Sequence, residues 1–481
     1  MLKPLFGLGV FALVGAVRSG WFAEGDTFWQ IQAGTEIRQQ HTVFLTDTFS
    51  WSMAGRAWHP NSWLFDVLLS MAWTGAGSVG LALFTFCCVA LVGVSVTFTA
   101  RALGARTHVT TALLVVPLLL WLSARPQTLT YALLPVVVLL AGRLMEESGR
   151  RLALGLAALY LLLTLWVNLH LAALAAVPAL AAGLAAALLT RRRSSGTPAA
   201  TRRTPAAACG CMTAVAILGV VVLGCATSPF GFGALGSALA TRDASTELIP
   251  EWAPLWRTSW MAVFTWAGAA IAVALAMAAW RRPHVPMFAA SAGLLLLGGA
   301  EAARFSPMAL VVAMPAAAAW ASGVDWRGGP RTRRVAFFAT GTAVGLVVAL
   351  VVLIAVRLPS FGRPAPDTYP TDTTVQAIPD GCRVLNEYDD GGYLVLRRSA
   401  DGVRVAMDGR NDVYGAALIT RMLELTEGRP GALAELNRDS VRCLLLDPRR
   451  PLVAQARKAG WLTTATDSNR VLLLSPGSQS N

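Results

Sequence analysis

The stretch 62–74, SWLFDVLLSMAWT, decides the architecture that the sequence predicts for the rest of the chain. It is too short to cross a bilayer, which takes about 20 consecutive apolar residues in a helix. Its Ser62, Asp66 and Ser70 recur at helical spacing and form one polar stripe. We therefore predict that 62–74 is a helix lying at the outer surface of a membrane and that it does not span it.

Composition supports a membrane protein around this helix. The chain has 481 residues, of which 55% are hydrophobic and 14% charged, and its mean hydropathy is +0.54. An ordinary soluble domain carries roughly 25% charged residues, and a disordered chain has low hydrophobicity, so both classes are excluded. An α-helical polytopic fold is predicted, with about eleven spans at 4–21, 76–100, 107–122, 127–142, 151–168, 170–190, 209–226, 259–280, 286–301, 305–322 and 335–357.

The loops between these spans sort by charge when 62–74 is kept outside. One side carries 17 basic and 3 acidic residues, and the other carries 8 basic and 9 acidic residues. The positive-inside rule makes the first side cytoplasmic, which places the N-terminus inside and the C-terminal tail outside the plasma membrane. The net charge of +13 arises from these Arg-rich loops, because the tail from Ser360 has 15 basic and 15 acidic residues. No nucleic-acid partner is therefore expected.

Two domains are predicted: 1–357, with the outer loop 22–61 and the interfacial helix 62–74, and an extracytoplasmic α/β domain at 358–481. In the tail, strand patterns at 383–387, 403–407, 441–446 and 470–474 alternate with helical patterns at 415–427, 430–438 and 450–459. The segments 387–394 (EYDDGGYL) and 407–415 (MDGRNDVYG) are interpreted either as tight turns or as an edge that binds a carbohydrate or another acceptor. Cys382 and Cys443 could pair in this oxidising location, and that question stays open.

The loop 22–61 carries the strongest functional signal. Asp26 opens a helical stretch, Asp47 lies in a later turn, and Trp58 and His59 lead into the interfacial helix. The alternative for Asp26 is a helix N-cap, for which Asp is favoured. Packing within the loop is the alternative for His59.

The order of these residues resembles the catalytic subunits of oligosaccharyltransferases and their relatives in the GT-C glycosyltransferase superfamily. The matching pieces are Asp26, Asp47-Thr-Phe49-Ser50, Gly55, Trp58-His59-Pro60 and Leu64-Phe65-Asp66. More loosely, the chain looks like a broad group of uncharacterised bacterial membrane proteins. Their shared pieces match Arg125-x-Gln127, Trp166-x-Asn168-x-His170, Ser228-Pro229-x-Gly231, Glu251-Trp252, Arg304-Phe305, Gly391-Gly392-Tyr393 and Asp408-Gly409-Arg410.

The resemblance implies transfer of a sugar from a polyprenyl-phosphate-linked donor to a glycan, lipid or protein acceptor on the outer face of the membrane. Asp26 matches the superfamily's catalytic position, where a carboxylate can take the proton of the acceptor hydroxyl. Arg125 and Arg304 lie at outer ends of spans and could hold the donor phosphate; snorkelling or an ion pair is the alternative. His170, Glu251, Asp47, Trp58 and His59 complete the candidate substrate-binding set, although a structural His170 and an interfacial aromatic belt around Trp252 are equally open.

One departure bears on the cofactor. Metal-dependent oligosaccharyltransferases have a second acidic motif in the next outer loop, where this chain has LSARPQTLT and no acid. This favours a metal-independent transferase and leaves a divalent cation, Mg or Mn, open. The competing functions are a non-catalytic membrane scaffold and a surface-polysaccharide polymerase or transporter. The sequence has no GxGxxG or P-loop fingerprint, which favours a lipid-linked donor over a nucleotide sugar.

Overall fold

The computed structural model describes residues 5–476 apart from 21, 107–108, 195–204, 232, 234–235, 237–249 and 326–328. It divides into two compact units. The first, here called the membrane unit, consists of Met1–Ser19, Leu83–Gly236 and Ile249–Pro359. The second, here called the loop–tail unit, is built mainly from Gly20–Ala82 and Ser360–Asn481. The loop after the first span therefore folds together with the tail.

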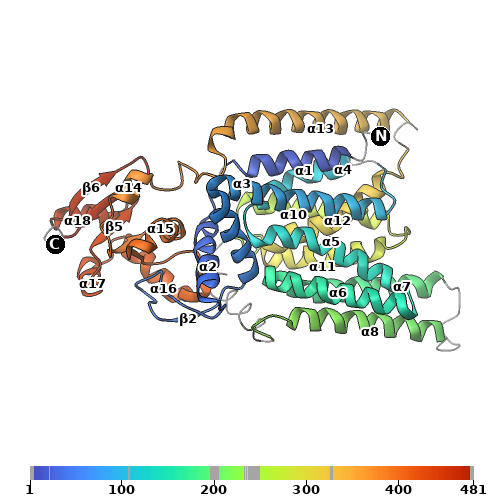
Figure 1. Cartoon of the computed structure of the whole chain (residues 1–481). Coiled ribbons are helices and arrows are strands. Elements are labelled where there is room, and N and C mark those ends of the chain that lie inside the picture. Colours follow the sequence, from blue (N-terminus) through green and yellow to red (C-terminus); the bar gives the residue numbers. More distant parts are fainter. Residues whose placement is uncertain are drawn as a thin grey trace. The chain divides into compact units, whose positions relative to one another are not determined.

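Helices make up almost all of the membrane unit (Figure 1), which confirms the predicted α-helical multi-pass fold. Among the described residues, seven helices are long and apolar enough to cross a membrane, and three shorter apolar helices accompany them. The helices are α1 (Leu5–Arg18), α3 (Trp63–Ala102), α4 (Val109–Leu114), α5 (Pro126–Leu144), α6 (Gly149–Leu169), α7 (Ala176–Ser194), α8 (Pro205–Ala226), α10 (Trp260–Ala278), α11 (Val285–Glu301), α12 (Ser306–Ala321) and α13 (Pro330–Arg357).

One predicted span differs from the structure. Residues 107–122 were expected to form one helix, but α4 ends at Leu114 and a 3-10 helix, η1, covers Val116–Trp121. Pro117 explains the break, because proline has no N–H to donate and its ring crowds the preceding turn.

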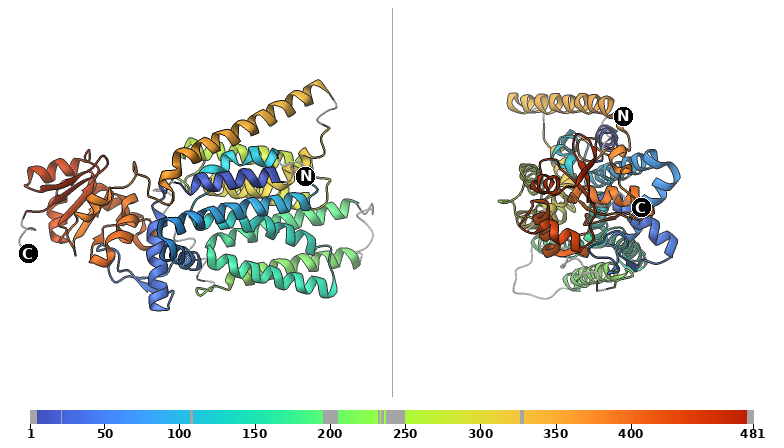
Figure 2. Two further views of the ribbon diagram at one scale, coloured as in Figure 1. Left: turned by 45° about the horizontal axis from the view of Figure 1, so that its top comes forward. Right: turned by 90° about the vertical axis from the view of Figure 1, so that its left-hand side faces the viewer.

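Helix α12 is the core of the membrane unit. Every residue of α12 except Trp320 is buried, and α10 and α11 pack along it. Its many alanines let neighbouring backbones approach closely, as is typical of packing between membrane helices. Helix α13 is the opposite case, since only Ala343 and Leu350 are buried along its 28 residues. Figure 2 shows from further sides that the helices of this unit run alongside one another.

Helix α3 contains a sharp bend at Ala76 and Gly77, where φ is −149° and +53°. The bend separates the predicted short helix 62–74 from the predicted span that begins at 76. The polar stripe of the short helix is buried: Ser62, Asp66 and Ser70 are at most 5% exposed.

The stripe faces helix α2 (Asp26–Gln40), where Gln30 Nε2 donates to Ser62 Oγ at 3.2 Å. Leu68 and Met71 of the short helix stay exposed instead. The helix thus turns its polar side to the protein and its apolar side outward, which suits a membrane surface.

The tail holds a five-stranded mixed sheet of order β4-β3-β5-β7-β6. Strands β3 (Arg383–Asn386), β4 (Arg404–Val405) and β5 (Cys443–Leu446) are parallel, whereas β7 (Val471–Leu474) is antiparallel to β5 and to β6 (Leu462–Thr466). Helices α14 (Asp372–Gln376), α15 (Gly391–Arg398), α16 (Asn411–Thr426), α17 (Ala432–Arg438) and α18 (Pro451–Lys458) connect them. The predicted small α/β domain is confirmed; β6, α14 and α15 were not foreseen.

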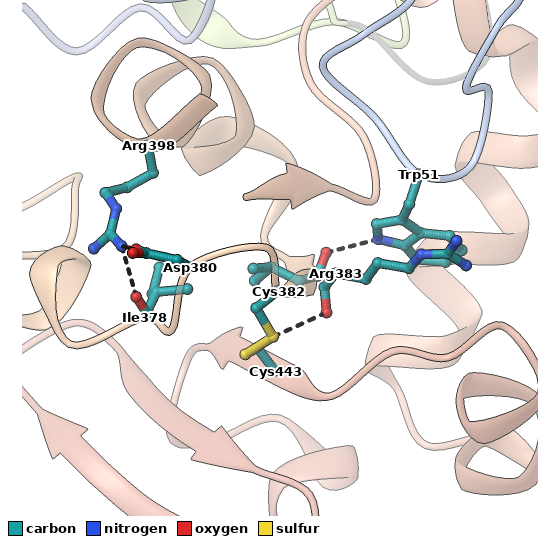
Figure 3. The surroundings of a disulfide bond; sticks show 8 residues. Trp51, Ile378, Asp380, Cys382, Arg383, Arg398 and Cys443 are labelled. Carbon is teal, nitrogen blue, oxygen red and sulfur yellow. Dashed lines mark hydrogen bonds and ion pairs between the residues drawn. A yellow bond between two sulfur atoms is a disulfide. The ribbon is translucent and has the colours of Figure 1, made fainter. Parts of the chain in front are cut away.

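A disulfide joins Cys382, just before β3, to Cys443, the first residue of β5 (Figure 3). It answers the question that the sequence left open. The surrounding loop is held by Arg398, whose Nη2 donates to Ile378 O at 2.8 Å and to Asp380 Oδ1 at 2.7 Å. The bridge ties two neighbouring parallel strands at the end where they begin.

Candidate functional site

Asp26 is the first residue of α2, and Gly25 occupies the N-cap position with no side-chain cap hydrogen bond. The Asp26 carboxylate is partly exposed, and its Oδ1 accepts a hydrogen bond from Trp29 Nε1 at 3.2 Å. The N-cap alternative for Asp26 is therefore not what the structure shows. An acidic residue in the first turn is still favourable against the helix dipole.

Two glycines of the tail motifs press against the start of α2. A Cβ on Gly409 would lie 2.2 Å from Asp26 Oδ1 and 2.9 Å from Trp29 Nε1, and a Cβ on Gly392 would lie 2.3 Å from Gly25 O. Only glycine leaves room for this approach. The segments that the sequence suggested as turns or as an acceptor edge thus border the Asp26 carboxylate directly.

Arg410 organises a second group of side chains in the loop–tail unit. Its guanidinium is buried and donates to Asp47 Oδ1 at 2.8 Å and to Asp408 Oδ2 at 2.7 Å. Tyr414 Oη donates to the same Asp408 oxygen at 2.9 Å. Asp47 was a candidate substrate ligand, but its side chain is fully buried and also accepts from Ser50 Oγ. In this conformation Asp47 holds Arg410 and does not reach solvent.

The aromatic candidates pack around this ion pair. Trp58 is 7% exposed, its Nε1 donates to Asp412 Oδ2 at 3.4 Å, and Arg410 Cζ lies 4.8 Å from its ring centroid. His59 is only partly buried and contacts the Phe44 ring edge-to-face at 6.4 Å between centroids. Trp58 is therefore a buried part of this region, whereas His59 is more exposed.

The neighbourhood of Asp26 is acidic. Desolvation by the surrounding chain, and then the negative charge of Asp26, raise the pKa of Asp389 above its ordinary value of 3.8, although the residue keeps contact with solvent. In the part of the chain that the structure describes, no three His, Cys, Asp or Glu side chains are arranged to hold a metal ion.

Four other candidates meet in the membrane unit. Arg125, at the start of α5, donates from Nη1 to Glu251 Oε1 at 2.8 Å. Arg304 lies in a 3-10 helix, η3 (Ala303–Phe305), with its Cζ 3.9 Å from the Trp252 ring centroid and its backbone N donating to Glu251 O at 2.9 Å. The ion-pair alternative for Arg125 is thus realised, with Glu251 as the acid. The Trp252 ring lies under the Arg304 guanidinium. The alternative of an interfacial aromatic belt does not require such a cation–π contact.

The two arginines of this cluster act on the titration of its acid. Burial raises the pKa of Glu251, but the charges of Arg125 and Arg304 outweigh it and lower the pKa below its ordinary 4.5. His170 is buried, with its Nδ1 2.8 Å from Thr130 Oγ1.

Sequence reasoning missed Arg410 and its partner Asp408 as organisers of the site. Their motif, MDGRND, was noticed but interpreted through its turn-forming residues. The alternation of Asp and Arg within it was the available signal, since a charged residue that becomes buried needs a partner of opposite charge.

No protein-family model matches the chain, and no curated protein matches its sequence. Solved structures do match its fold. One is the oligosaccharyltransferase of Archaeoglobus fulgidus in its apo form, with a TM-score of 0.57 and 12% sequence identity over 93% of this chain and 70% of that one. The fold is thus that of a multi-pass membrane protein with a C-terminal mixed-sheet domain. In particular, it is similar to the fold of this archaeal oligosaccharyltransferase.

Proposed function

We propose that this chain is a membrane glycosyltransferase that moves a sugar from a polyprenyl-phosphate-linked donor to an acceptor on the outer face of the plasma membrane. The observation that carries the proposal is the Asp26 carboxylate, which opens α2 without capping it and borders Gly409 of the tail. The likeness to a fold whose solved example is an oligosaccharyltransferase supports it. So does the order of motifs in the loop 22–61.

Asp26 would act as the general base. The acceptor hydroxyl loses its proton to a carboxylate oxygen as its own oxygen bonds to the anomeric carbon of the sugar. The bond from that carbon to the phosphate oxygen breaks, and the lipid phosphate leaves with the electron pair. Trp29 Nε1 donates to Asp26 Oδ1 at 3.2 Å, which orients the carboxylate at the start of α2 for this task.

Arg125 and Arg304 would receive the negative charge of the departing phosphate. Arginine stays charged at every physiological pH and can donate two parallel hydrogen bonds to a phosphate. Glu251 fixes one guanidinium by an ion pair, and Trp252 fixes the other by stacking. Such preorganised charges stabilise a transition state more effectively than mobile ones.

The test is complementation of a deletion strain, followed by profiling of its lipid-linked and surface glycans. The deletion should remove one surface glycan and cause its lipid-linked precursor to accumulate; the wild-type gene should reverse both. Asp26→Asn should reverse neither at equal membrane abundance. The matched control is Asp367→Asn, the same change at an exposed residue of the tail.

Two results would contradict the proposal. Full complementation by Asp26→Asn would favour the scaffold alternative, because a scaffold needs no base. A surface glycan of altered chain length without precursor accumulation would favour a polymerase. Repeating the transfer in washed membranes with and without EDTA, then with added Mg or Mn, measures the cation requirement.

A further inference from the structure

The Arg-rich end of the membrane unit contains a cavity of about 730 Å³. The ends of α5, α7 and α11 and the turn between α10 and α11 form its walls. Arg191, Arg281 and Arg282 line it, and Glu146 is the single acid among its lining residues. The glycosyl-transfer proposal uses none of these residues.

The acid does not neutralise the cavity. Glu146 lies 3.7 Å from Arg191 Nη2 through one oxygen and 3.8 Å from His284 Nε2 through the other. Within the described part of the chain, Arg281 and Arg282 form no ion pair. Arg282 is confined, since a Cβ on Gly323 would lie 2.1 Å from its Nη2. The cavity therefore holds an excess of two positive charges, at least one of them held in place.

Part of the wall is apolar. Met145, Ala187, Trp280 and Met287 line the same space as the arginines. A second cavity of about 440 Å³ shares Trp280, Arg281 and Arg282 with the first. Tryptophan with its amphipathic ring is typical of the level at which lipid head groups lie.

We propose that the larger cavity binds the phosphate head group of an anionic phospholipid from the leaflet at the Arg-rich helix ends, which the loop charges predict to be cytoplasmic. Arg281 and Arg282 would hold the phosphate, and Met145 and Met287 would contact the first part of the acyl chains. Basic pockets between membrane helices bind anionic head groups in this way. A free phosphate would satisfy the arginines but leave the apolar wall unused, and a zwitterionic head group would bring a compensating positive charge.

The experiment measures lipid retention by the full-length chain in detergent, using native mass spectrometry with dioleoyl phosphatidylglycerol, dioleoyl phosphatidylcholine or inorganic phosphate as probe. We expect phosphatidylglycerol to bind at least tenfold more tightly than phosphatidylcholine. The double variant Arg281→Gln/Arg282→Gln should lose about tenfold or more of that affinity. The matched control Arg150→Gln/Arg151→Gln makes the same charge change at exposed residues of α6 outside the cavity and should retain it.

A second variant tests the cavity itself. Ala187→Phe fills the space without changing charge and should also weaken phosphatidylglycerol binding, with Ala187→Leu as the milder substitute if the larger ring prevents folding. Normal phosphatidylglycerol binding by Ala187→Phe would overturn the proposal, because the lipid would then not occupy the cavity. An equal loss of affinity in the Arg150→Gln/Arg151→Gln control would overturn it too, because surface charge alone would then explain the binding. Inorganic phosphate competing as effectively as the lipid would overturn the lipid assignment.

Discussion

At the scale of single residues, Arg410 is the most constrained charge in the loop–tail unit. It is fully buried, carries two carboxylate partners, and lies 4.7 Å from the Phe49 ring centroid. Removing one member of such a group leaves the others charged in a medium that solvates them poorly. The ion pair between Arg410 and Asp47 also joins residues 363 positions apart, so it ties the loop to the tail.

Arg410→Met should destabilise the loop–tail unit by roughly 3–5 kcal/mol, because Asp47 and Asp408 would remain buried without a cation. Thermal unfolding of the full chain, followed by tryptophan fluorescence, measures the change. Arg449→Met is the matched control: Arg449 is exposed, so its ion pair with Asp447 should contribute far less than the buried one. Equal shifts of the unfolding temperature in the two variants would mean that the buried ion pair stabilises the fold no more than the exposed one.

The raised pKa of Asp389 predicts a pH dependence. Between the ordinary value of 3.8 and the raised one, the folded chain keeps a proton that the unfolded chain has lost. The free energy of unfolding therefore falls as the pH rises through this window. Asp389→Asn should flatten that fall, measured as unfolding midpoints from pH 4 upward, whereas the exposed Asp367→Asn should not. An unchanged slope in Asp389→Asn would refute the assignment.

At the scale of elements, the bend inside α3 rests on one backbone conformation. Gly77 has φ +53° and ψ −134°, a region open almost only to glycine, and nothing lies within 4 Å of where its Cβ would be. The cost of a side chain there is therefore a pure backbone effect.

Two neighbouring glycines offer a matched test. Gly77→Ala should lower stability by roughly 1–3 kcal/mol through backbone strain. Gly75→Ala, in an ordinary helical conformation with equally open surroundings, should be neutral or stabilise by up to about 1 kcal/mol. The measurement is the unfolding midpoint of each variant. Equal midpoints for Gly77→Ala and Gly75→Ala would show that the backbone conformation at Gly77 is not required.

Local patterns explain which elements the sequence could predict. Apolar runs predicted the helices, and alternation with turns predicted β3, β5 and β7 nearly to the residue. Strand β6 escaped because its residues are mostly exposed and polar, and α15 escaped because it begins with Gly391 and Gly392, which are poor helix formers.

The candidate site was predictable only in part, for a related reason. Asp26, Arg125, Glu251 and Arg304 stand out by residue type at ends of apolar runs. The partners of Asp47 and Trp58 lie in the tail, and nothing in a local pattern encodes a pairing over more than 350 residues.

At the scale of the whole molecule, the charge of the loops predicts that the tail lies outside the cell. The Cys382–Cys443 disulfide agrees with this orientation, because such bonds persist in oxidising compartments. An epitope tag appended to Asn481 should be removed by protease added to intact spheroplasts. A tag placed before the first span should survive until the membrane is opened. The reverse pattern would overturn the orientation and with it the outward site.

The two largest pieces of the loop–tail unit, Gly20–Ala82 and Ser360–Asn481, are separated in the sequence by most of the membrane helices. Ribosomes add about 5–20 residues per second, so tens of seconds pass between the synthesis of Ala82 and that of Ser360. During that wait Phe28 lacks Tyr369 and Tyr393, whose rings it will meet at 5.3 and 5.2 Å. A nascent chain released early would contain the membrane helices and the loop 22–61 without its partners from the tail. The proposed sugar transfer should therefore begin only after translation has finished.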